Sequence, residues 1–184
     1  MSNRQYLTCA ETAKMVRAAL KESFPGVKFS VKSSVYSGGA SITISYMDGP
    51  TYDQVKSVAG MFEGSYFDGM TDYKGSNYGS LDGQEVRFGT DFIFINRKFS
   101  IELMTAQAVI ACQYYGYKMP EIVQGVCGVY IKDYVDNNFI AQRNIGNKIA
   151  EVSLCDTRPS KTLARVGFLG DDGYGYGAVG RLAA

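Results

Sequence analysis

The sequence predicts an α+β fold that begins with a helix, two strands and a second helix, and the spacing of apolar residues is the main indication. Apolar side chains recur at helical spacing after Thr8 and again after Thr51, whereas residues 27–35 and 42–46 alternate between apolar and polar. Two glycines at 38–39 separate the alternating stretches, which is typical of an antiparallel hairpin. Since a two-stranded hairpin is not stable alone, we expect a small antiparallel sheet that later strands extend and helices cover.

Local signals mark where the elements begin and end. Thr8 and Glu11 have the spacing of a capping box, and Thr51 and Gln54 repeat it. The Pro-Gly pair at 25–26 ends the first helix. For the second half we expect a strand over 86–95, a helix over 100–115, a strand over 126–131, a helix over 138–150 and a strand near Val152.

Residues 64–83 have an unusual composition, with five glycines, three tyrosines and three aspartates. Such a segment indicates a loop that exposes aromatic side chains for contact. We therefore divide the chain into a module over 1–83 and an α+β extension over 84–184 that packs on it as one compact unit. A Gly- and Tyr-rich tail is expected from about residue 170.

Composition excludes several classes of function. The chain has no His, so Ser-His-Asp and Cys-His triads and imidazole acid–base steps are excluded. Its four cysteines show no C-x-x-C spacing, and we predict reduced thiols with no bound metal or cofactor. No long apolar run and no signal-peptide core is found, so we expect an intracellular protein without a membrane partner.

Charge is balanced overall but not along the chain. Lys+Arg number 19 against 18 Asp+Glu, too even for a protein that binds polyanions by bulk charge alone. Residues 1–46 nevertheless hold six basic and two acidic side chains, and residues 47–83 hold two basic and six acidic ones. The basic side chains that share the first helix or the polar strand face are Lys14, Arg17, Lys21, Lys28 and Lys32. Together they predict a surface that holds a few phosphates.

Three short motifs in the first half carry a resemblance to a known family. They are Phe24-Pro-Gly-Val-Lys28-Phe, Tyr36-Ser-Gly-Gly39 and Phe67-Asp-Gly-Met70. Over about residues 7–73 the chain resembles the large polyvalent-protein-associated domain family numbered 29. The resemblance implies a protein of a phage or conjugative element that acts in the cytoplasm of a bacterial host and blunts its defences against incoming DNA. It implies no agreed catalytic residues.

Three hypotheses for the function remain open. The one we favour is an anti-CRISPR or anti-restriction type of inhibitor, which binds a defence effector protein or ribonucleoprotein without catalysis. Its predicted contacts are Tyr66, Phe67, Asp68, Asp72, Tyr73 and Tyr78. The second is a nucleic-acid-binding module that holds phosphate with the five basic residues named above. The third is an enzyme in which Glu85, Asp91 and Lys98 act with Mg²⁺.

Overall fold

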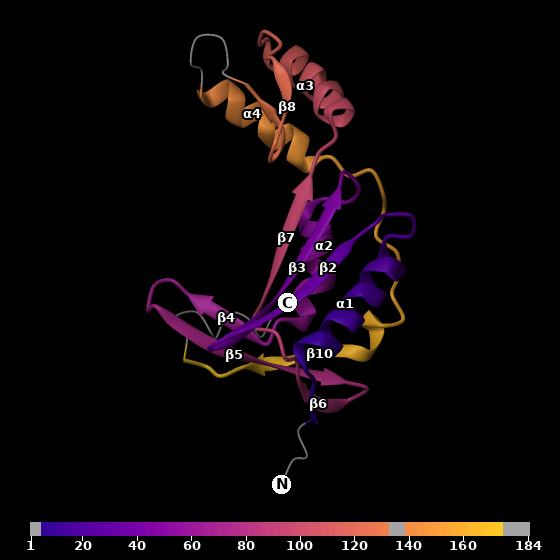
Figure 1. Ribbon diagram of the computed structural model, residues 1–184, viewed down its shortest axis with the longest axis vertical. Helices are drawn as coiled ribbons and strands as arrows, with labels where there is room; N and C mark the ends of the chain where they lie inside the picture. The colour runs from indigo at the N-terminus through magenta and orange to yellow at the C-terminus, as the bar shows by residue number, and fades with distance from the viewer. Residues whose placement is uncertain (1–4, 133–138, 175–184) are drawn as a thin grey trace. The chain divides into compact units, whose positions relative to one another are not determined.

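The computed structural model describes residues 5–132 and 139–174, and it confirms the α+β fold class (Figure 1). A short strand β1 (Gln5–Tyr6) precedes α1 (Cys9–Ser23), β2 (Ser30–Tyr36), β3 (Gly39–Met47) and α2 (Tyr52–Ala59). The predicted helix-strand-strand-helix start is therefore confirmed. Strand β1, which was not predicted, pairs in parallel with β6 (Gln84–Arg87).

Helix α1 begins with the predicted capping box. The Thr8 hydroxyl accepts the backbone N–H of Glu11 at 3.2 Å, and the Glu11 carboxylate accepts the backbone N–H of Thr8 at 2.8 Å. These bonds satisfy donors that the first turn of a helix leaves without partners. Val16 and Leu20, one turn apart, are fully buried and anchor the apolar face of the helix.

The predicted hairpin belongs to a three-stranded sheet with the order β2-β3-β7, in which β7 is Phe92–Lys98. The central strand β3 carries Ile42 and Ile44, both fully buried. Strand β2 lies at the edge, and all its side chains except Val31 are exposed. Extension of the hairpin by a strand of the second half is thus confirmed.

The predicted loop over 64–83 is wrong, because most of these residues form β-strands. Strand β4 (Ser65–Asp68) pairs antiparallel with β5 (Tyr73–Leu81). Further along, β5 pairs with β6 on one edge and with β10 (Val166–Asp171) on the other. The result is a second sheet with the order β1-β6-β5-β10, to which β4 is added beside β5.

The glycines and aspartates of this segment serve strands and tight turns. Asp72, Asp82 and Gly83 take left-handed backbone, with φ of 50°, 53° and 79°. An Asp-Gly pair with positive φ at both positions is favoured in the two-residue turn of a hairpin. Gly75 lies opposite Tyr66 in the β4–β5 register, and a β-carbon at Gly75 would overlap the Tyr66 ring. Composition alone does not distinguish this ring-over-glycine packing from a loop.

The predicted strand over 86–95 is wrong in part, because a break over 88–91 divides it. Strand β6 before the break belongs to the sheet of β5, whereas β7 after the break pairs with β3. At the break the backbone of Gly89 lies very close to the backbone of Leu7. A β-carbon on Gly89 would overlap the Leu7 carbonyl oxygen. The break therefore moves the chain from one sheet to the other.

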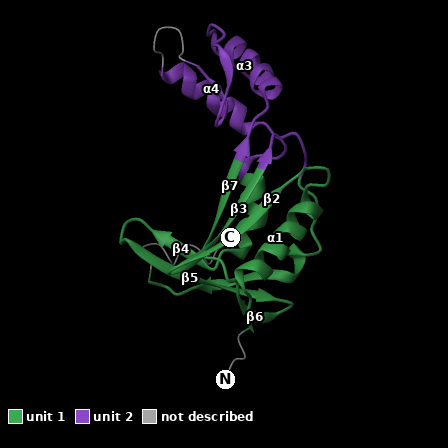
Figure 2. Ribbon diagram, viewed as in Figure 1, with its two compact units in different colours: residues 1–45, 53–96, 157–184 green, residues 46–52, 97–156 purple. Residues whose placement is uncertain are grey.

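The chain forms two compact units that are discontinuous in sequence (Figure 2). The first comprises residues 1–45, 53–96 and 157–184, and the second comprises residues 46–52 and 97–156. This division differs from the predicted one after residue 83, since the 84–184 extension contributes to both units. Strand β10 ends at Asp171, next to the predicted start of the tail at about residue 170. The rest of that tail, residues 175–184, lies outside the described residues.

The second unit contains α3 (Ile101–Tyr115), β8 (Ile122–Gly125), β9 (Gly128–Ile131) and α4 (Phe139–Glu151). Both helices and β9 were predicted, whereas β8 was not. Met104 and Ala108 of α3 pack with Ile145 and Ile149 of α4 in one apolar core. The expected strand near Val152 is wrong, because the described residues at that position form no strand.

Arg97 binds backbone carbonyls of the chain near Val152, which does not pair as a strand. Its guanidinium donates to the carbonyl oxygens of Val152, Ala150, Gly49 and Asp48 at 2.6 to 3.3 Å. The planar group with its several donors satisfies carbonyls that a sheet would otherwise pair.

Among the described residues, no helix combines the length and apolar character that crossing a bilayer requires.

We expect Gly75→Ala to destabilise the first unit by about 1–3 kcal/mol, because the new methyl group overlaps the Tyr66 ring and the core cannot expand freely. Urea unfolding of the full chain measures the change. Gly69→Ala is the matched control, since a β-carbon there meets no atom within 4 Å. Equal stability of the two variants would contradict the packing of Tyr66 over Gly75.

Candidate binding surfaces

The structure divides the six predicted partner-binding residues between the interior and the surface. Tyr66 and Asp68 are buried, with 6% and 7% of their surface exposed. Tyr73 and Tyr78 are half-buried. Phe67 and Asp72 are exposed, Phe67 to 56%. All six therefore lie on β4, β5 and the turn between them, but only two present most of their side chain to a partner.

The carboxylate of Asp172 explains why Tyr66 and Tyr73 are turned inward. It accepts the Tyr66 hydroxyl at 2.7 Å, the Tyr73 hydroxyl at 3.2 Å and the backbone N–H of Ser76 at 2.7 Å. Burial raises the pKa of Asp172, but the hydrogen bonds, that of Tyr66 foremost, outweigh burial and hold this pKa below its usual value. The two hydroxyls thus fix the β4–β5 hairpin to the chain that follows β10.

The turn between β4 and β5 is fixed from within as well. The Asp68 carboxylate accepts the backbone N–H of Met70 at 2.9 Å, two residues on, as in an Asx turn. Beside it Phe67 and Met70 are exposed to 56% and 81%. We call Phe67, Met70 and Asp72 the hairpin tip. Two large apolar side chains are thus displayed on a backbone whose conformation is already held.

The five predicted basic residues all lie at the surface of the first unit. Lys14, Arg17 and Lys21 are exposed on α1, and Lys28 and Lys32 are exposed before and within β2. Helix α1 packs beside β2 (Figure 1).

A direct bond joins the two elements that carry these charges. The Arg17 guanidinium donates to the backbone carbonyl of Val31 on β2 at 2.8 Å. Helix α1 and strand β2 therefore lie side by side, as a basic surface shared by the two elements requires. We call these five residues the basic surface.

The carboxylate proposed for metal-dependent catalysis has structural partners. Asp91 accepts the Ser65 hydroxyl at 3.0 Å, the Ala40 N–H at 3.1 Å and the Lys74 ammonium at 2.8 Å. Glu85 lies on β6, and Lys98 ends β7 in the second unit. In residues 5–132 and 139–174 no three Cys, Asp or Glu side chains gather as a metal site would need. Catalysis by Glu85, Asp91 and Lys98 with Mg²⁺ therefore stays a hypothesis, and the described residues provide no group of metal ligands that supports it.

The family model described as large polyvalent protein associated domain 29 matches residues 7–100. This span is just over half of the 184 residues, and the chain belongs to this family. Membership associates the protein with phages and mobile genetic elements. The match extends beyond the predicted residues 7–73 and includes β5, β6 and β7. No curated protein and no solved structure is significantly similar to the chain.

We expect Asp172→Asn to lower stability at neutral pH by about 1–3 kcal/mol, because charge-assisted bonds to two tyrosines and a backbone amide are weakened. A carboxyl whose pKa is lower in the folded chain contributes stability above the unfolded value, and this contribution is lost as pH falls through the folded pKa. The variant should therefore lose less stability than the wild type below about pH 4.

Thermal unfolding between neutral and acidic pH measures this difference. Asp72→Asn, an exposed position with left-handed backbone that Asn tolerates, is the control and should follow the wild type. Parallel pH profiles for Asp172→Asn and wild type would show that Asp172 does not hold the hairpin.

Proposed function

We propose that the protein is an accessory factor of a phage or mobile element that antagonises a bacterial defence system. It acts in the cytoplasm of the host by non-catalytic binding to an effector protein or ribonucleoprotein. The observation that carries this proposal is the hairpin tip, where Phe67 and Met70 are exposed on a turn held by Asp68. Family membership supports the mobile-element setting.

The energetics of interfaces explain why such a tip suits a protein partner. A few large side chains carry most of the binding free energy when an interface desolvates them. Ordering a flexible loop on binding costs free energy, and a turn that is already held avoids much of that cost. Asp72 next to these side chains adds a charge that favours a basic partner surface. The tip therefore combines apolar area, a fixed backbone and one negative charge.

A pull-down with the tagged full chain tests this proposal. The lysate contains CRISPR and restriction effectors and is treated with nuclease, so that only protein-mediated capture remains. We expect Phe67→Ser with Met70→Ser to reduce the captured effector by about tenfold or more. Phe94→Ser with Met119→Ser is the matched control, since it removes the same two residue types at positions exposed to 54% and 41%.

Biological readout completes the test. The wild-type chain should restore plaque formation on a host that carries the captured system, and the tip variant should not. Equal capture by tip and control variants, or capture without any effect on plaques, would contradict the proposal.

A second candidate function is nucleic-acid binding through the basic surface. It is favoured by one specific observation, that α1 and β2 adjoin and place five cations on neighbouring elements. Contacts of this kind bind phosphates with little regard to sequence, and their strength falls with salt because counterions are released.

We expect Lys14→Gln with Lys21→Gln to reduce the slope of log Kd against log salt by about two, one for each lost phosphate contact. Fluorescence anisotropy with labelled duplex and single-stranded DNA measures this slope. Lys118→Gln with Lys161→Gln changes the net charge equally at exposed positions outside the basic surface. If both double variants lose affinity alike, the basic surface is not the binding site.

A further inference from the structure

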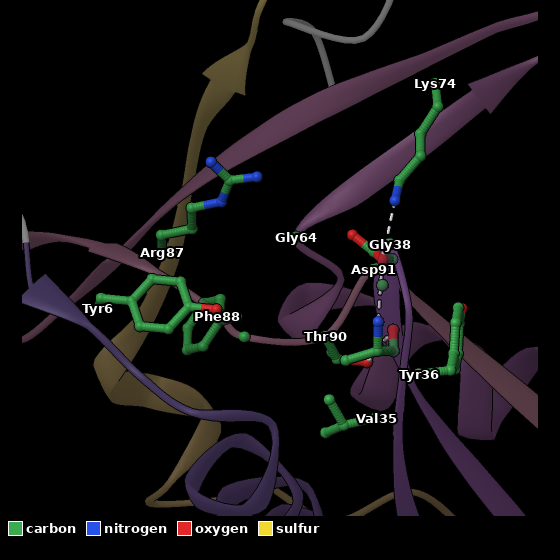
Figure 3. A pocket seen from close by; sticks show the side chains of 13 residues that line it. Tyr6, Val35, Tyr36, Gly38, Gly64, Lys74, Arg87, Phe88, Thr90 and Asp91 are labelled. Carbon is green, nitrogen blue, oxygen red and sulfur yellow. Dashed lines mark hydrogen bonds and ion pairs between the residues drawn. The ribbon is translucent and has the colours of Figure 1, made fainter.

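An open cavity of about 520 Å³ lies beside Asp91 in the first unit (Figure 3). Segments far apart in sequence line it: Tyr6, residues 35–36 and 38–40, Gly64, Lys74 and residues 87–91. Its volume falls within the range of small-molecule sites, about 300–1,000 Å³. None of the hairpin tip or basic surface residues lines it. The cavity is therefore a separate site, and a ligand bound in it would be independent of the proposed function.

The charges around the cavity favour an anion. Lys74 and Arg87 are its cations, and Asp91 is the one carboxylate in its lining. Asp91 is already held by Lys74 at 2.8 Å. Within the part of the chain that the structure describes, the half-buried Arg87 side chain has no ion pair or hydrogen bond. A partly desolvated guanidinium without a partner is a strong site for phosphate, whose oxygens match its planar set of donors.

Figure 3 shows Arg87 and Lys74 on different strands, with the Lys74 ammonium joined to Asp91. Arg87 comes from β6 and Lys74 from β5. Because Asp91 stays bonded to Lys74, their charges cancel, and Arg87 supplies the net positive charge of the lining that a phosphate binds.

Two aromatic rings complete the site. The side chains of Tyr6 and Tyr36 are exposed to 65% and 50%, although both line the cavity. Among the described residues neither hydroxyl makes a hydrogen bond. Tyr6 is paired with Arg87 in the β1–β6 register, and an exposed tyrosine ring next to a cation is a usual means of holding a base by stacking while its phosphate is bound. A planar base can therefore stack on a tyrosine ring while Arg87 binds the phosphate of the same ligand.

We propose that this cavity binds a nucleoside phosphate, either a free nucleotide or one unit of a single strand. Arg87 binds the phosphate, and Tyr6 or Tyr36 stacks on the base. Lys74 and Asp91 close the side of the cavity that faces β5. Sequence patterns do not indicate this site, because its residues come from positions 6, 36, 74 and 87 and share no motif.

Calorimetric titration of the full chain with nucleoside monophosphates, and anisotropy with a short labelled single-stranded oligonucleotide, test the proposal. We expect Arg87→Gln to weaken binding by about tenfold or more, since a charged hydrogen-bond partner is lost. Tyr6→Ser with Tyr36→Ser should weaken binding of nucleotides but leave inorganic phosphate unchanged. Arg158→Gln, an exposed arginine outside the lining, is the matched control.

The two sources of the ligand are distinguished by which titration responds. Binding of monophosphates assigns a free nucleotide, and binding of the oligonucleotide alone assigns a single strand. Either result supports the site if Arg87→Gln weakens that binding about tenfold or more. Thermal unfolding confirms that Arg87→Gln is folded, as expected for a side chain without internal bonds. The proposal is overturned if neither probe binds at millimolar concentration. It is also overturned if inorganic phosphate binds as tightly as nucleotides, or if Arg87→Gln binds like Arg158→Gln.

Discussion

The carboxylate of Asp91 is the interaction on which the arrangement of the first unit depends. It receives bonds from Ala40 on β3, Ser65 on β4 and Lys74 on β5, so one side chain joins the two sheets where the chain crosses between them. Burial raises the pKa of Asp91, but Lys74 foremost and then the other donors outweigh it and lower this pKa. A β-carbon on Gly39 would overlap this carboxylate, which explains the glycine at the first position of β3. Asp91 thus connects the hairpin β2–β3 with the strands β4 and β5 and lines the cavity beside them.

Other carboxylates of the first unit also bind groups from other segments of the same unit. Glu22 of α1 accepts the Ser160 hydroxyl at 2.6 Å and the Thr162 N–H at 2.9 Å, and so fixes the segment that leads to β10. Asp82 is paired with Arg165, and Glu63 with Lys56. Much of the acidic excess over residues 47–83 is thus used within the fold. The negative charge available to bind a partner is therefore smaller than the sequence count indicates. Exposed apolar side chains accordingly contribute a larger share of the binding surface.

Most of what the sequence predicted correctly was local, although the pairing of the hairpin with a later strand was predicted as well. The inward position of Tyr66, which the sequence did not indicate, depends on residues far apart in the chain. The capping box of Thr8 is formed by residues three apart, and the exposure of Lys14 and Lys21 follows from helical spacing. The position of Tyr66 depends on Asp172, which lies 106 residues away. Tyrosine in a glycine-rich stretch has the same composition whether its ring faces a partner or covers Gly75. Only the register of β4 and β5 distinguishes the two, and that register is a property of the folded chain.

The discontinuous first unit has a consequence for synthesis on the ribosome. Strand β5 receives its last neighbour, β10, only after the whole of the second unit has been translated. At about 5–20 residues per second, the 75 residues from Arg97 to Asp171 take roughly 4–15 s. During that interval the β5 edge is an unpaired row of backbone donors and acceptors on a nascent chain. Slow codons or a pause within residues 97–156 lengthen this exposure, so the yield of folded protein depends on how fast the inserted unit is made.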